Sequence, residues 1–197
     1  MKEQEKIIRS YNDADVITDD SRKVYGCAVK FETESQNLGF IETIKRGAIT
    51  QETIENSDIY ALFNHNEDEV LARSRYGNGS LKLELREDGL YYEFDAPNTE
   101  KGNEVLEHLK RNELEGSSFA FSLPKDGSGD KWYKDDEGNL RRDIYHIEKL
   151  YDVSCVYEPA YLDTSCDRRA LNMIDKSSTI SKKMDLMIEE IEQLKIK

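Results

Sequence analysis

Apolar and polar residues alternate along several short segments of the chain, and this pattern predicts a mainly β fold. In residues 79–88 (GSLKLELRED), three leucines alternate with polar residues, as in a strand with one buried face. Residues 88–96 (DGLYYEFDA) follow across the turn residues REDG, so the two segments predict a β-hairpin. Residues 23–33, 117–123 and 144–161 carry aromatic and β-branched residues and are also predicted to be strands, the last of them one or two.

Two segments predict helices. Residues 98–116 can be capped at the N-terminus by Asn98 or Thr99, and their apolar residues share one helical face: Val105, Leu106 and Leu109. A shorter helix is predicted within residues 51–63, with Thr50 as its N-cap. Because these helices are few beside the strands, we expect an α+β fold that is mainly β.

Composition divides the chain into three parts. Residues 1–22 contain charged and Asp-rich turn sequences and predict a flexible lead-in, whereas residues 23–175 predict one domain. Within that domain, residues 124–143 predict a mobile loop or an exposed hairpin. In residues 176–197, apolar side chains recur at spacings of 4, 3, 4 and 3 and predict an amphipathic helical tail: Ile180, Met184, Met187, Ile191 and Leu194. About two heptads are too short for a stable isolated helix, so the tail either docks on a partner or packs on its own domain.

Charge and composition exclude several classes of protein. The 197 residues carry a net charge of −13, and nucleic-acid binding would need clustered Lys and Arg. No apolar run approaches the ~20 residues of a membrane span, and the charged N-terminus lacks the apolar centre of a signal peptide, so we expect a cytosolic protein. The 3 cysteines form no CxxC pair, which predicts reduced thiols, and we expect no metal and no cofactor.

The 3 histidines of the chain are its candidates for a general base. His65 ends an apolar run and precedes an expected acidic loop, a place where a histidine is usually a surface or capping residue. His108 lies among charged residues of the predicted helix. His146 stands in strand-like sequence and is the main competitor of His65. Zinc hydrolysis through His65, His146 and acidic residues stays an alternative, although no HExxH or HxH spacing supports it.

A serine pair and one aspartate complete the residues that could carry chemistry. In EGSSFAF, Ser117 and Ser118 lie where a helix ends and an apolar strand begins, which is typical of a turn but also suits a nucleophile. The spacing differs from GxSxG, which disfavours an α/β-hydrolase. Asp152 lies between apolar residues and therefore needs a partner, either an arginine or a histidine nitrogen.

Three short motifs, LFNHN, LEGSSFAF and LYDVSCVYEPAY, occur in an order that resembles the prohead maturation proteases of tailed bacteriophages. The resemblance spans residues 24–169, and three motifs in the right order are more specific than any one of them. It implies an assemblin-like fold, a small β-barrel flanked by helices, which is shared with herpesvirus assembly proteases. The chain departs from the family pattern at Asn66, which replaces Asp, at Ala120, which replaces Gly, and at Asp152, which replaces Glu.

The resemblance also implies the roles of individual residues in a serine endopeptidase. His65 would be the base, Ser118 the nucleophile and Asp152 the third member of the triad. Ser117 is the alternative nucleophile, and His146 or Glu148 would take part if Asp152 did not. Arginines help to position an oxyanion water in related assembly proteases, and two follow the third motif here: Arg168 and Arg169.

The function that this resemblance implies is cleavage of the scaffolding portion of the capsid protein, and of the protease itself, during prohead maturation. The expected partners are the major capsid protein with its scaffolding segment and further copies of the chain, with no nucleic acid and no membrane. The expected location is the host cytoplasm, inside the prohead. A catalytically inert assembly or scaffolding protein with the same fold is the alternative.

Overall fold

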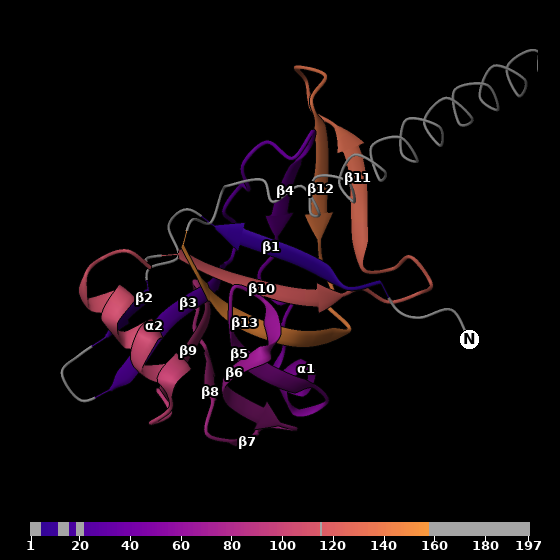
Figure 1. Ribbon diagram of the computed structural model, residues 1–197. Helices are drawn as coiled ribbons and strands as arrows, with labels where there is room; N and C mark the ends of the chain where they lie inside the picture. Colours follow the sequence, from indigo (N-terminus) through magenta and orange to yellow (C-terminus); the bar gives the residue numbers. More distant parts are fainter. Residues whose placement is uncertain (1–4, 12–15, 19–21, 115, 158–197) are drawn as a thin grey trace, which may run out of the picture. The chain divides into compact units, whose positions relative to one another are not determined.

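Strands make up about half of the computed structural model, which describes residues 5–11, 16–18, 22–114 and 116–157 (Figure 1). The expected mainly β class with few helices is confirmed. In chain order the elements are β1 (Ile7–Tyr11), β2 (Val16–Thr18), β3 (Lys23–Lys30), β4 (Ile41–Ile44), α1 (Gln51–Glu55), β5 (Asp58–Phe63), β6 (Asn66–Arg75), β7 (Asn78–Gly79), β8 (Lys82–Leu85), β9 (Gly89–Asp95), α2 (Glu100–Lys110), β10 (Gly116–Ser122), β11 (Asp130–Lys134), β12 (Leu140–Ile144) and β13 (Lys149–Val156).

These strands form three sheets. The largest has six strands in the order β1-β10-β13-β5-β6-β7, and the others have the orders β2-β3-β9-β8 and β11-β12-β4. Neighbouring strands are antiparallel except for β13 with β5 and β12 with β4. Within the described part of the chain these sheets do not close into a barrel, so the small barrel stays a prediction.

The strand β10 lies at the centre of the fold. All seven of its residues are buried, and it pairs with β1 on one side and with β13 on the other. The rings of Phe119 and Phe121 stack with their centroids 5.1 Å apart inside the core. Small side chains on the other face, those of Ser118 and Ala120, leave room for neighbouring groups. A strand packed on both faces is held rigidly, which suits it to position a reactive side chain.

Both predicted helices are present but shorter than their segments. Thr50 caps α1 by accepting a hydrogen bond from the Thr53 backbone N–H, and the rest of that segment becomes β5. Thr99, one of the two predicted caps, accepts a hydrogen bond from the Gly102 backbone N–H at the start of α2. Neither described helix is long and apolar enough to cross a membrane.

Two segments differ from the structure expected from the sequence, and a third shows which of two expected structures is present. The described part of residues 1–22 contains β1 and β2 instead of only flexible lead-in, because β1 pairs with β10 far along the chain and β2 pairs with the nearby β3. The acidic segment after His65 begins β6, since it folds back onto β5. Residues 124–143 contain the exposed hairpin of β11 and β12, the second of the two expected forms. The predicted tail, residues 176–197, lies outside the described residues.

Candidate active site

Three side chains that are far apart in the sequence meet beside β10. The Nε2 atom of His65 lies 2.6 Å from the Ser118 Oγ atom, and its Nδ1 atom lies 2.5 Å from Oδ1 of Asp152. The imidazole therefore connects a hydroxyl on one side with a carboxylate on the other. This arrangement of a hydroxyl, an imidazole and an acid is the geometry of a serine-protease triad.

The pairing of β10 with β13 places the hydroxyl and the carboxylate. Ser118 lies opposite Ser154, and Ala120 lies opposite Asp152. Because side chains two residues apart in a strand point to the same face, all four of these side chains share one face of the sheet. Asp152 is one methylene shorter than the glutamate of the family pattern, yet its carboxylate reaches the imidazole.

A two-residue turn places His65. Phe63 at the end of β5 pairs with Asn66 at the start of β6, and the two residues between them, Asn64 and His65, have φ values of 50° and 57°. Positive φ at both central positions is typical of a type I′ hairpin turn, and Asn and His adopt it more readily than most side chains. The Asn64 backbone N–H donates to the Cys155 carbonyl oxygen at 3.0 Å, so the turn is tied to β13 beside the aspartate.

Asp152 is almost fully buried, with 1% of its surface exposed, and polar groups surround its carboxylate. The Ser154 hydroxyl donates to Oδ1 at 2.8 Å, and the Lys6 ammonium lies 3.0 Å from Oδ2. Burial favours the neutral acid, but the hydrogen bond and charge of His65, the charge of Lys6 and the hydrogen bond from Ser154 outweigh it. Together they lower the pKa of Asp152 below its usual value. The carboxylate therefore stays ionised at neutral pH and can stabilise an imidazolium.

Sequence reasoning missed two residues of this site. Ser154 lies within a quoted motif, and its spacing of two residues from Asp152 was the available signal for a shared strand face. Its hydroxyl oxygen also lies 3.2 Å from His65 Nδ1. Lys6 belongs to the segment that was expected to be a flexible lead-in, and no local pattern in that segment indicates a contact with Asp152.

The alternative candidates lie apart from this contact chain. The buried Ser117 hydroxyl points to the other face of β10 and donates to the Tyr92 hydroxyl at 3.1 Å. His146 and Glu148 are exposed between β12 and β13. Arg168 and Arg169 lie outside the described residues. Among the residues described, no group of three or more His, Cys, Asp or Glu side chains could hold a metal ion.

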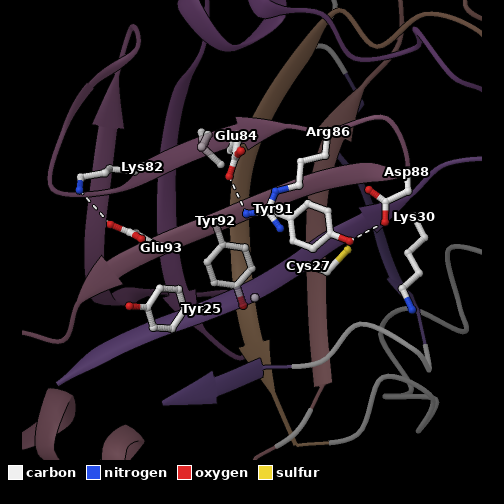
Figure 2. Close-up of a pocket in the computed structure, with 12 residues that line it drawn as sticks. Tyr25, Cys27, Lys30, Lys82, Glu84, Arg86, Asp88, Tyr91, Tyr92 and Glu93 are labelled. Atoms are coloured by element: carbon white, nitrogen blue, oxygen red, sulfur yellow. Dashed lines mark hydrogen bonds and ion pairs between the residues drawn. The ribbon is translucent and has the colours of Figure 1, made fainter. Parts of the chain in front are cut away.

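A separate hollow of about 740 Å³ lies on the four-stranded sheet, against β3, β9 and β8, and Figure 2 shows the side chains that line it. Its polar groups pair with one another: the Tyr91 hydroxyl donates to Asp88 at 2.7 Å, and Lys82 donates to Glu93 at 2.8 Å. None of the three triad side chains lines this hollow. The catalytic candidates are therefore assigned by their mutual contacts and not by a cavity.

The sequence pattern of the caudovirus prohead serine proteases matches residues 8–178. The chain belongs to this family. The match includes all three motifs and most of the chain, as the resemblance predicted. No curated protein matches the chain.

One solved structure has a fold similar to that of this prohead protease family member. The bacteriophage T4 capsid assembly protease, gp21, is similar with a TM-score of 0.50 and 10% sequence identity. The similarity covers 79% of this chain and 99% of the T4 chain. At this level of identity the likeness concerns the fold, and the assignment of catalytic residues rests on the contacts described above.

Proposed function

We propose that this prohead protease family member is a serine endopeptidase with Ser118 as nucleophile, His65 as general base and Asp152 as the acid that orients and stabilises the imidazole. The observation that carries this proposal is the unbroken contact chain from Ser118 Oγ through both ring nitrogens of His65 to Asp152 Oδ1. Family membership supports the same reaction class.

The reaction follows from the arrangement of these atoms. Ser118 Oγ attacks the carbonyl carbon of the scissile peptide while its proton passes to His65 Nε2, and Asp152 stabilises the imidazolium through Nδ1–H. The C–N bond then breaks, and the leaving amine takes the proton from Nε2, which leaves an ester on Ser118. Water attacks the ester and gives a proton to His65, and the carboxylic acid product leaves as Ser118 regains its proton.

The substrate that we propose is the scaffolding portion of the major capsid protein, cut inside the prohead in the host cytoplasm, with self-cleavage as a further step. Residues 23–175 would form the protease domain around an assemblin-like barrel. The tail of residues 176–197 would dock on the scaffolding segment or on another copy of the chain. Family membership and the fold relative, whose name describes a capsid assembly protease, support this substrate class.

Coexpression with the major capsid protein, followed by intact mass measurement, tests the proposal. Ser118→Ala and His65→Ala should each abolish processing, and the double variant should be no worse than either single one, because triad members act as a unit. His146→Ala is the matched control, since this histidine is exposed and should leave processing unchanged. Processing by Ser118→Ala would refute the assignment of the nucleophile.

One observation favours a second candidate, an inert assembly protein with the same fold. Ser118 has no exposed surface, and its hydroxyl donates to the Arg9 carbonyl oxygen at 2.8 Å. A serine that stays covered could not reach a substrate. A serine-reactive fluorophosphonate separates the two candidates, because it would label the enzyme at Ser118 and would leave an inert protein unlabelled.

A further inference from the structure

The strand β1 occupies most of one edge of β10, the strand that carries the nucleophile. Figure 1 shows β1 running beside β10 in the opposite direction. The register extends from Ile7 opposite Phe121 to Tyr11 opposite Ser117 and places Ser10 opposite Ser118. Among the residues that the structure describes, β1 is the terminal strand of the six-stranded sheet and pairs on one side only. Without β1, β10 would present a free row of backbone N–H and C=O groups, which is a template for another extended chain.

With β1 in place, the nucleophile is blocked. Ser118 is fully buried, and its single hydroxyl proton lies between two acceptors, His65 Nε2 at 2.6 Å and the Arg9 carbonyl oxygen at 2.8 Å. The peptide oxygen of β1 therefore competes with the base for the proton that catalysis must move. It also lies beside Ser118 Oγ, where a substrate peptide has to approach.

The residue just before this strand, Lys6, acts on the carboxylate of the triad. Lys6 reaches across β10 and brings its ammonium to 3.0 Å from the buried Oδ2 atom of Asp152. A second cation at this carboxylate reduces the stabilisation that the carboxylate can give to an imidazolium on His65. The covered hydroxyl comes from a contact of β1, and the paired carboxylate comes from the residue just before it.

Two side chains on one face of β1, those of Ile7 and Arg9, contact groups that require an apolar and a basic partner. Ile7 is buried in the core, and the Arg9 guanidinium donates to both oxygens of Glu42 at 2.6 and 3.1 Å. Glu42 is fully buried, and its other cation is Arg142, which donates only to Oε2 at 3.0 Å. A chain that replaced β1 would have to supply a cation for Oε1 of Glu42, since a buried carboxylate that loses a partner is costly.

We propose that this edge of β10 is the substrate-binding edge and that β1 fills it as an internal substitute for substrate. This proposal rests on the proposed function. The substrate is an extended peptide that displaces β1, pairs antiparallel with β10, and places an apolar side chain at the position of Ile7 and a basic one at the position of Arg9. Strand exchange conserves the backbone hydrogen bonds of β10. Once Lys6 leaves, the Asp152 carboxylate again stabilises an imidazolium on His65 with its full charge.

A disulfide that locks β1 onto β10 tests the proposal in the full chain. Ile8 and Ala120 lie directly opposite each other in the register, and opposite Cβ atoms in an antiparallel pair are close to disulfide distance. In Ile8→Cys/Ala120→Cys, oxidation should slow fluorophosphonate labelling of Ser118 by about tenfold or more, and reduction should restore it. The two single variants and the unmodified protein, treated with the same oxidant and reductant, control for the native cysteines. Equal labelling of the oxidised and reduced forms would overturn the proposal.

A second variant tests the proposal without a disulfide. Arg9→Gln removes one cation from Glu42, so β1 should leave more often and labelling should be about tenfold faster. Arg22→Gln is the matched control, because Arg22 donates to the Ala96 and Pro97 carbonyls away from β1 and its loss should not change labelling. A lower melting temperature of Arg9→Gln without faster labelling would show that β1 is a permanent strand of the fold, which would overturn the proposal.

The two tests together separate this proposal from the proposed function. If no form is labelled at all, the proposed nucleophile is wrong. If all forms are labelled equally, only the role of β1 is wrong.

Discussion

The substitution Asp152→Asn gives the sharpest test of the triad, because it removes a charge and keeps the shape of a buried side chain. At an effective dielectric constant of about 20, a carboxylate and an imidazolium with charges ~4 Å apart attract each other by about 4 kcal/mol. Since about 1.4 kcal/mol corresponds to a factor of ten in rate, loss of this attraction should lower kcat by about a thousandfold. Asp152 is buried and lies close to His65, so solvent screens the attraction between the two charges only weakly.

The orientation of the new amide adds to the loss. While β1 is paired with β10, Lys6 lies 3.0 Å from Oδ2 and needs an acceptor, so in the free protein the amide oxygen should take that place and leave the NH₂ group facing His65 Nδ1. The ring must then accept at Nδ1 and carry its proton on Nε2, where it cannot take the proton of Ser118. The combined decrease should approach about 10⁴-fold, the size seen when the imidazole of a serine-protease triad is held in the wrong tautomer.

The assay is single-turnover cleavage of the capsid protein together with the rate of fluorophosphonate labelling. Far-UV circular dichroism and a thermal melt would show that the variant is folded. Asp136→Asn is the matched control, because it makes the same chemical change at an exposed position and should leave both rates unaltered. Activity of Asp152→Asn within about tenfold of the unmodified protein would contradict the reasoning and remove Asp152 from the mechanism.

Three further predictions follow from the same contacts, and a fourth concerns the tail. Ser117→Ala should cleave the capsid protein normally, since the Ser117 hydroxyl contacts Tyr92 and not the imidazole. If Ser117→Ala were inactive and Ser118→Ala active, the wrong hydroxyl would have been assigned as nucleophile. Ser154→Ala should lower kcat by about tenfold to a hundredfold, with partial rescue by threonine, because it removes a hydrogen bond of about 1.5–3 kcal/mol to a charged acceptor; an unchanged kcat would exclude a positioning role. The pKa of Asp152 is lower in the folded protein than in the unfolded chain. Its contribution to the free energy of unfolding should therefore be complete above the unfolded pKa of about 3.9 and should disappear as the pH falls through the folded pKa. Urea unfolding at a series of pH values should show that the free energy of unfolding falls less steeply with decreasing pH for Asp152→Asn in this range. Deletion of residues 176–197 should leave a folded protein that is still labelled but enters proheads poorly, as measured by sedimentation of proheads, whereas an insoluble product would show that the tail belongs to the core.

The local elements of the fold were largely predictable from the sequence. The leucine alternation indicated the hairpin of β8 and β9, and Thr50 and Thr99 cap α1 and α2 as their positions suggested. Strand periodicity and helix capping depend on neighbours a few residues away, so a single sequence contains the information. The order of the three motifs, also readable in one dimension, indicated the family that the sequence match confirms.

The prediction was least complete where strands pair over long distances. The segment of β1 looks like a flexible lead-in because its partner β10 lies more than a hundred positions further along, as the 109-residue separation of Arg9 and Ser118 shows. The acidic residues after His65 suggested a loop, yet they begin β6 because the type I′ turn folds them back onto β5. Local composition carries no information about such partners.

The sequence by itself determined which residue types could form a triad, since it offers few histidines and places Ser118, His65 and Asp152 in recognisable motifs. Only the tertiary structure decided that these three side chains touch and that Lys6 lies at the same carboxylate. The physical reason is that a triad needs atoms within hydrogen-bond distance, and this distance depends on the register of β10 with its neighbours and on a turn with positive φ. A register shifted by one residue would turn Ser118 to the opposite face of the sheet, with almost no change in the local pattern of the chain.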